Sequence, residues 1–227
     1  MMSLCSNKME KVIIVLEHYS MKELDKFTKW ACEIQSLAQA GLEYSTNIYD
    51  IERFERLRDI SAEMIAEKAD ISIEKAKSLF CNEKGYQTPK IDTRAAVFDG
   101  DKILLVREND GRWSLPGGWC DFDLSIAENT IKETREEAGL DVTADRLIAV
   151  QDRKKHNEPP YVYGIIKTFM LCSAIGGEFK ENSETTERRY FSKSELPENL
   201  SGEKVNKEQI LMCFEAKDNE NWEVGFD

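Results

Sequence analysis

Three glutamates in one short stretch, Glu133, Glu136 and Glu137, are the residues of this chain whose spacing best fits metal-assisted chemistry. Side chains three and four residues apart lie on neighbouring positions of one helix face. Carboxylates at these spacings repel one another and destabilise an isolated helix by roughly a few tenths of a kcal/mol per pair. A divalent cation would reverse that repulsion, and Mg²⁺ or Mn²⁺ prefers such oxygen ligands. We therefore expect all three glutamates to bind metal and to serve in catalysis.

The glutamates belong to the segment 115–140, which contains a glycine turn, a capped helix and a second glycine turn. Ser125 and Glu128 are spaced as a capping box, which predicts a helix that begins at about Ile126 and ends at Gly139. Its expected inward stripe is Ile126, Ala127, Thr130, Ile131, Thr134 and Ala138. The three glutamates are expected on a different side.

This segment resembles the Nudix box, whose pattern is glycine, five residues, glutamate, seven residues, then R-E-U-x-E-E-x-G-U with U aliphatic. After Gly118 the chain reads WCDFD, Leu124, SIAENTI and KETREEAGL. Leu124 thus replaces the first glutamate, Lys132 replaces the arginine, and Thr134 stands at an aliphatic position. The resemblance implies a Nudix fold, a divalent metal, and the three glutamates as its ligands.

The replacements at Leu124 and Lys132 can be understood as a pair. In the family, the glutamate and arginine at these positions are expected to brace the loop against the helix by a charged hydrogen bond. Loss of the acid removes the need for a bidentate guanidinium, and Lys132 is then a remnant. This change affects the expected loop geometry and leaves the reaction class unchanged.

The general base has several candidates. Glu136 could act through a metal-bound water, or a carboxylate from the loop 181–187 could act instead, either Glu184 or Glu187. For these two residues a solvated polar loop is an equally good interpretation. The backbone carbonyl of Gly117 is a further candidate metal ligand, because glycine lets the backbone approach closely.

Candidate substrate-binding residues lie outside the box. They are Arg94, Arg153 and His156, although a loop histidine beside lysines is more often simply exposed. Trp119 and Phe122 lie in the box loop, where we expect them to pack against the loop and not to stack on substrate.

The N-terminal part of the chain has the periodicity of helices, which are expected over residues 21–40, 50–66 and 73–80. Gly41 is expected to end the first of them. Residues 1–20 cannot be assigned. We predict an all-α N-terminal domain over residues 1–84, a linker over 85–92 and the catalytic domain over 93–227.

The helical segment and the following GYQTPKIDTRAAVF resemble the N-terminal part of one Nudix branch, hydrolases of nucleoside diphosphates linked to another group X. That branch includes ADP-ribose and CDP-choline pyrophosphatases, and its box tends to read GGW-x-D without the first glutamate. The resemblance implies a homodimer formed through the helices. Phe27, Trp30 and Tyr44 could anchor it, or could equally be core residues.

Beyond the linker the pattern changes to strands separated by turns, at 94–98, 102–107, 113–115, 147–152, 162–175 and 189–191. A last helix is expected over 207–217. This pattern predicts an α+β fold with a mixed sheet, preceded by a small all-α domain, and the resemblance implies that the sheet belongs to the Nudix α/β/α sandwich.

The net charge of −12 is concentrated in the catalytic part, because residues 1–90 carry 13 basic and 15 acidic residues and the remainder carries 18 and 28. Such a surface argues against binding to a nucleic-acid backbone. It suits a small phosphorylated substrate bound through cations.

The apolar run 12–16 is too short for a membrane span. The six cysteines are widely spaced, which suggests reduced thiols in the cytoplasm.

Together these features predict a metal-dependent pyrophosphohydrolase that converts an X-linked nucleoside diphosphate, with CDP-choline and ADP-ribose foremost, to a nucleoside monophosphate and a phosphorylated X. Two rival classes stay open. An RNA-directed Nudix hydrolase or exonuclease would need a positive track. A non-catalytic nucleotide sensor would explain Leu124 and Lys132 as marks of decay.

Overall fold

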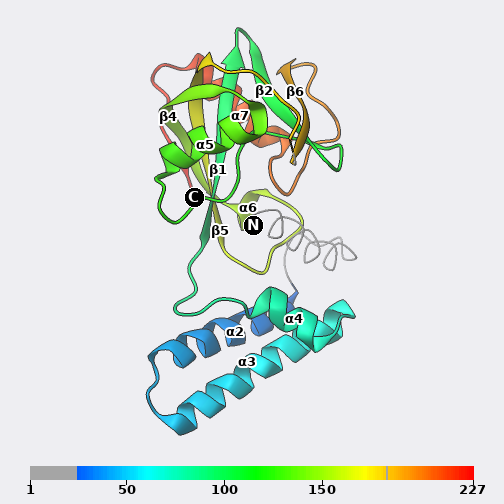
Figure 1. Ribbon diagram of the computed structural model, residues 1–227, viewed down its shortest axis with the longest axis vertical. Helices are drawn as coiled ribbons and strands as arrows, with labels where there is room; N and C mark the ends of the chain where they lie inside the picture. The colour runs from blue at the N-terminus through cyan, green and yellow to red at the C-terminus, as the bar shows by residue number, and fades with distance from the viewer. Residues whose placement is uncertain (1–24, 183) are drawn as a thin grey trace. The chain divides into compact units, whose positions relative to one another are not determined.

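The computed structural model describes residues 25–182 and 184–227. These residues form two compact units (Figure 1). The first unit contains the helices up to Pro89 together with Glu158–Gly164, and the second contains Lys90–Asn157 and Ile165–Asp227. The unassigned residues 1–20, and the first residues of the helix predicted from residue 21, lie outside the described residues.

The described residues of the first unit form the helices α2 Lys26–Tyr44, α3 Ile48–Ala69 and α4 Ile73–Phe80. Each helix begins after a side chain that accepts backbone N–H groups of its first turn, namely Asp25, Asn47 and Ser72. The prediction for α4 is confirmed. Helix α3 is longer than predicted at both ends, because Asn47 caps its start and Asp70 ends it in the left-handed conformation.

Gly41 lies inside α2, so the prediction that it ends this helix is wrong. A Cβ atom at this position would lie 2.4 Å from the ring of Phe54 in α3. That distance is far below van der Waals contact, so glycine is needed for the close approach of the two helices. The helix continues to Tyr44, and the N–H of Ser45 still bonds to the carbonyl of Gly41.

The segment Glu158–Gly164 interrupts the catalytic region in sequence but belongs to the first unit. The hydroxyl of Tyr163 donates to the carbonyl of Leu79 at the end of α4. Tyr161 and Tyr163 are both buried, with ring centroids 5.7 Å apart. The strand predicted from residue 162 therefore begins only at Ile165, because the apolar residues before it serve the helical unit.

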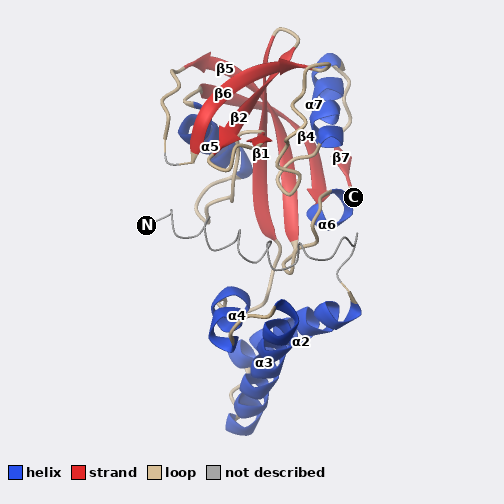
Figure 2. Cartoon of the chain, turned by 90° about the vertical axis from the view of Figure 1, so that its right-hand side faces the viewer, coloured by secondary structure: helices blue, strands red, loops and turns tan. Residues whose placement is uncertain are grey.

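In the second unit, the described residues form one mixed sheet of seven strands, in the order β3-β2-β1-β5-β4-β7 with β6 paired to β2 (Figure 2). Strands β1 and β5 are parallel, whereas β4 is antiparallel to β5. The bounds are β1 Lys90–Asp99, β2 Lys102–Glu108, β3 Trp113–Ser114, β4 Asp141–Asp152, β5 Ile165–Gly176, β6 Thr185–Ser192 and β7 Gly225–Phe226. Several strands are thus longer than predicted, and β6 begins inside the segment expected to be a loop.

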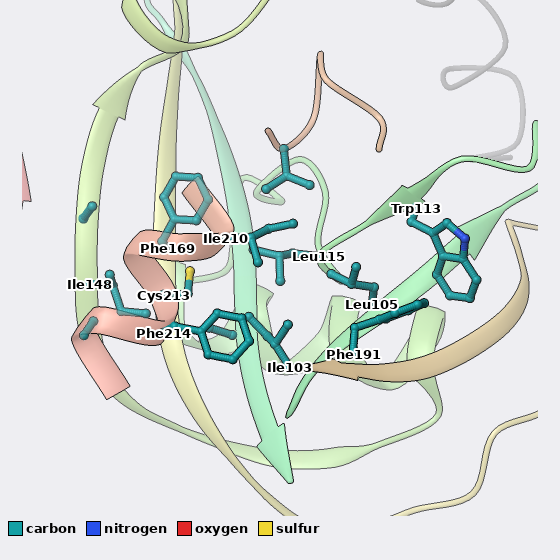
Figure 3. Close-up of a cluster of buried hydrophobic side chains, with 14 residues drawn as sticks. Ile103, Leu105, Trp113, Leu115, Ile148, Phe169, Phe191, Ile210, Cys213 and Phe214 are labelled. Atoms are coloured by element: carbon teal, nitrogen blue, oxygen red, sulfur yellow. The ribbon is translucent and has the colours of Figure 1, made fainter. Parts of the chain in front are cut away.

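The helices of this unit are α5 Ile126–Ala138, α6 Arg153–His156 and α7 Lys207–Asp218. Side chains of β2 alternate between the two faces of the sheet. Leu104 lies in a buried cluster with Ala138 of α5, whereas Ile103 and Leu105 lie in another cluster with Phe214 of α7 (Figure 3). The sheet is therefore covered by α5 on one face and by α7 on the other, and the predicted α/β/α sandwich is confirmed.

Helix α5 has the bounds that its sequence predicts. The Ser125 hydroxyl accepts the N–H of Glu128 at 3.3 Å, and the Glu128 carboxylate accepts the N–H of Ser125 at 2.9 Å. Gly139 ends the helix with a φ of 63°, in the left-handed region. The capping box thus fixes where the helix that carries the glutamates begins.

The substitution Ser125→Ala should lower the free energy of unfolding by about 1 kcal/mol, because the first turn of α5 loses its side-chain acceptor. Urea unfolding followed by circular dichroism measures the change. Ser125→Thr keeps the hydroxyl and is the matched control. An unchanged midpoint for Ser125→Ala would show that the cap does not stabilise the folded chain.

Candidate active site

The three glutamates of α5 differ in exposure. Glu133 and Glu137 are 8% and 7% exposed, whereas the side chain of Glu136 is 57% exposed. The prediction that all three lie away from the buried side is therefore wrong for Glu133 and Glu137. The buried stripe is more polar than expected, because this side of the helix faces the glycine loop; it consists of Asn129, Thr130, Glu133, Thr134, Glu137 and Ala138.

The glycine loop, residues 116–120, runs along the edge of β1. Three backbone hydrogen bonds of 2.8 to 2.9 Å join them: Ala95 N–H to Pro116 O, Thr93 N–H to Gly118 O, and Cys120 N–H to Ile91 O. Gly117 lies between the first two with a φ of 145°, and a Cβ there would lie 1.9 Å from the carbonyl oxygen of Thr93. Only glycine can occupy this position without moving the strand or the loop.

Glu137 points at this loop and accepts the N–H of Gly117 at 2.9 Å. Burial raises the pKa of Glu137 to about 8, and the positive charges of Lys204 and Arg94 oppose this only in part. Lys204 comes from the segment before α7 and pairs with Glu108 at 2.5 Å. Sequence reasoning missed Lys204, because a single lysine in the stretch GEKVN carries no motif or periodicity that would mark it.

Lys132 lies among the other carboxylates. Its ammonium is 3.0 Å from Glu133, 3.2 Å from Glu136 and 3.2 Å from Asp121 of the box loop. Burial disfavours the charge on Lys132, but these three carboxylates outweigh it and raise its pKa. Burial also raises the pKa of Glu133, and Lys132 partly opposes that shift.

These contacts decide how well the site fits a divalent metal. In the described parts of the chain, no group of three or more His, Cys, Asp or Glu side chains is arranged to hold a metal ion. Lys132 separates Glu133 from Glu136, and Glu137 is turned toward Gly117. The donor chemistry fits nevertheless, because all donors are hard oxygens and two of the carboxylates are buried without full compensation of their charge.

Gly118 adds a steric argument for this fit. A Cβ atom at Gly118 would lie 2.7 Å from a carboxylate oxygen of Glu133. The glycine therefore leaves room for that carboxylate. A larger residue at this position would fill the space.

Arg94 is 4% exposed and lies beneath the loop. It pairs with Asp92 at 2.8 Å and donates to the carbonyl of Leu115 at 3.2 Å. Asp92 also pairs with Lys167, and although burial acts in the opposite direction, the two cations lower the pKa of Asp92. The structure thus places Arg94 as a support of the loop, in electrostatic contact with Glu137.

The loop before β6 lies against the end of α5. The side-chain amide of Asn182 donates to the carbonyl of Glu136 at 2.9 Å, and the Thr185 hydroxyl donates to the carbonyl of Glu137 at 2.7 Å. Glu184 belongs to this turn and is exposed. Glu187 is engaged in β6, where it pairs with Arg107 at 3.6 Å.

The remaining candidates have other contacts. Arg153 is buried and donates to the carbonyl of Glu203 at 3.2 Å. The ring of His156 lies 2.9 Å from the carboxylate of Asp227. Both side chains are thus held by residues near the C-terminus. The side chain of Phe122 is fully exposed, so the expectation that it packs against its loop is wrong.

Two protein-family models match this chain. A model described as a UDP-X-like, N-terminal oligomerisation domain matches residues 25–80, and a NUDIX domain model matches residues 88–212. The curated protein named Putative ADP-ribose pyrophosphatase YjhB, from Bacillus subtilis (strain 168), is 45% identical over 192 residues. That match covers 83% of this chain and 92% of the relative.

Two solved structures are similar over long stretches. The crystal structure of an ADP-ribose pyrophosphatase from Streptococcus suis is 53% identical, with a TM-score of 0.58, and covers 62% of this chain and 100% of its own. The crystal structure of a UDP-X diphosphatase is 30% identical, with a TM-score of 0.58, and covers 88% of this chain and 98% of its own. The second similarity thus extends over most of the chain.

The substitution Gly117→Ala should destabilise the second unit by about 2 kcal/mol or more, because the added Cβ meets the backbone of β1 and φ is positive. Urea unfolding measures the loss. Gly202→Ala is the matched control, because nothing lies within 4 Å of a Cβ at Gly202 and its φ is not positive. Equal stability of the two variants would contradict the tight pairing of the loop with β1.

Proposed function

This chain belongs to the Nudix hydrolase family, and from that premise we propose that it hydrolyses the diphosphate of X-linked nucleoside diphosphates. The products are a nucleoside monophosphate and a phosphorylated X. The observation that carries the proposal is the position of Glu133, Glu136 and Glu137 on one helix beneath a glycine loop that is paired to β1. ADP-ribose and CDP-choline are the leading substrates. The names of the similar proteins, ADP-ribose pyrophosphatase and UDP-X diphosphatase, support the substrate class.

Glu133, Glu136 and Glu137 are the residues that would hold Mg²⁺ or Mn²⁺, and the carbonyl of Gly117 would add a backbone oxygen. When bound, such an ion supplies charge neutralisation on the diphosphate and an acidified water. The chain's own residues do the positioning. The N–H of Gly117 orients Glu137 at 2.9 Å, and Lys132 holds Glu133 and Glu136 at 3.0 and 3.2 Å.

The residue that removes the proton from the attacking water must be an accessible carboxylate near α5. Glu136 satisfies this best, because its side chain is 57% exposed while Glu133 and Glu137 are buried. Glu184 is the second candidate, because its turn is hydrogen-bonded to the last turn of α5. Glu187 is the third, and its ion pair with Arg107 would first have to break.

The charge of the catalytic part favours a small substrate over a nucleic acid. Residues 91–227 carry 18 basic and 28 acidic residues, and this excess of negative charge disfavours binding of a nucleic-acid backbone. Cys81, Cys120, Cys172 and Cys213 are free thiols, as a reducing compartment such as the cytoplasm allows. None of the described helices combines the length and the apolar composition needed to cross a membrane.

We also propose that the chain is a homodimer joined through its helical unit, in keeping with the oligomerisation domain matched there. Helix α2 exposes four large apolar side chains at spacings of three and seven residues: Phe27, Trp30, Leu37 and Tyr44. Their exposed fractions are 40, 49, 61 and 69%. A stripe with this spacing is typical of a helix that packs against another helix.

The activity is tested with a substrate panel of ADP-ribose, CDP-choline, a UDP-linked compound and RNA, with identification of the products in Mg²⁺ and in Mn²⁺. Glu136→Gln should lower kcat by about 100-fold, since even outer partners of a metal ligand contribute roughly 10- to 100-fold. EDTA should abolish activity, and added Mg²⁺ should restore it. Glu215→Gln, at an exposed position of α7, is the control that should leave kcat unchanged.

Turnover of RNA in place of the small diphosphates would reject the proposed substrate class. Binding of nucleotides without turnover of any compound would identify a sensor.

The dimer is tested by Leu37→Glu, which places a charge in the middle of the exposed stripe. We expect the variant to elute as a monomer in size-exclusion chromatography with light scattering, because a buried unpaired charge opposes association. Ser36→Glu adds the same charge on another side of α2 and should leave the mass unchanged. An unaltered dimer for Leu37→Glu would place the interface elsewhere.

A further inference from the structure

We propose that Asp121 supplies the acid that the box lacks at Leu124, and that Asp121, Asn129 and Lys132 form a clasp that holds the glycine loop to α5. The three residues act as positioning residues, because they orient the loop and the glutamates and do not touch the reacting atoms. The role in catalysis rests on the proposed function. The clasp itself is a property of the fold and can be tested without it.

Two hydrogen-bonding groups of α5 hold the same loop residue. Lys132 binds the Asp121 carboxylate at 3.2 Å, and the side-chain oxygen of Asn129 accepts the Asp121 N–H at 3.1 Å. Asn129 and Lys132 are three residues apart and therefore lie next to each other on one face of the helix. Asp121 is thus fixed through both its backbone and its side chain.

Asn129 extends the clasp to the sheet. Its amide donates to the hydroxyl of Thr93 in β1 at 2.9 Å, and the side chain is completely buried. The N–H of Thr93 in turn donates to the carbonyl of Gly118 at 2.9 Å. Helix, loop and strand therefore meet at one buried polar point, where a missing partner would leave a polar group unsatisfied.

The position of Asp121 explains how it can replace an acid at residue 124. The N–H of Leu124 donates to the carbonyl of Asp121 at 3.2 Å, so the two residues lie at the two ends of one turn before α5. Leu124 is thus one turn away from the carboxylate that contacts Lys132. The Asp121–Lys132 pair is therefore the counterpart of the acid–arginine brace, moved three residues toward the N-terminus.

Lys132 also connects the clasp to the glutamates. The same ammonium contacts Glu133 at 3.0 Å and Glu136 at 3.2 Å. A lysine has three donors that can reach separate carboxylates, whereas a guanidinium directs paired donors at one. Asp121 thus holds Lys132 in place, and Lys132 holds two of the three glutamates.

The central variant is Asp121→Asn, which removes the charge and keeps the size of the side chain. Mn²⁺ affinity, measured from the electron paramagnetic resonance of free Mn²⁺, should weaken about tenfold, as for outer partners of metal ligands. Hydrogen exchange of residues 116–124, which include the glycine loop and the turn before α5, should become faster. On whichever compound of the panel is hydrolysed, kcat should fall about tenfold with little change in KM, because the loop geometry matters most in the transition state.

The decisive readout is rescue. Leu124→Glu, added to Asp121→Asn, restores the acid at the family's position and should return both Mn²⁺ affinity and loop exchange close to the values of the unmodified chain. Lys132→Arg in the unmodified background should keep the loop protected. Arg135→Gln is the matched control, because Arg135 lies on the same helix but forms its exposed ion pair, at 3.3 Å, with Asp141 of β4.

Unchanged Mn²⁺ affinity and loop exchange in Asp121→Asn would overturn the clasp. A loss that Leu124→Glu does not restore would overturn the replacement of the missing acid by Asp121. If the unmodified chain hydrolyses no compound of the panel, the proposed function fails, but loop exchange still decides whether the clasp exists. Far-ultraviolet circular dichroism of each variant separates loss of the clasp from loss of the fold.

Discussion

The site depends on one steric constraint, the absence of a side chain at Gly117. Only because this residue is glycine can the loop 116–120 lie against the backbone of Thr93 and complete the edge of β1. That pairing brings the Gly117 N–H to Glu137 and leaves room beside Gly118 for Glu133. Loop, strand and helix are therefore positioned by backbone contact, and the carboxylates take their places from that framework.

The site also requires that its buried charges be compensated, because buried charges are unfavourable unless they are paired. From Glu137 inward the charges alternate in sign, through Arg94 and Asp92 to Lys167. Each member has an oppositely charged neighbour, but burial still raises the pKa of Glu137 to about 8 and lowers the pKa of Lys167 to about 8. Glu137 thus has incompletely compensated charge at the position where a divalent cation would stabilise it.

Local signals in the sequence predicted local structure well. The cap at Ser125 and the helix ending at Gly139 were readable because each depends on a few neighbouring residues. Features that depend on a distant partner were not readable. Gly41 was interpreted as a helix end, because the ring of Phe54 that it accommodates comes from another helix. The role of Asp121 was also hidden, since Lys132 lies 11 residues further along the chain and only the folded loop brings them together.

The contacts of Lys132 also bear on how an acidic site can bind an acidic substrate. The Lys132 ammonium contacts three carboxylates, those of Asp121, Glu133 and Glu136, whereas Glu137 is bound to the loop. Lys132 and its three carboxylates therefore keep a net negative charge. A diphosphate brought to it directly would be repelled. Lysine can hold the glutamates in register but cannot reverse the sign of the site, whereas a divalent ion adds two charges among the same oxygens. The proposed reaction therefore assigns two roles: the fixed cation arranges the carboxylates, and an exchangeable divalent cation would make the approach of the substrate favourable.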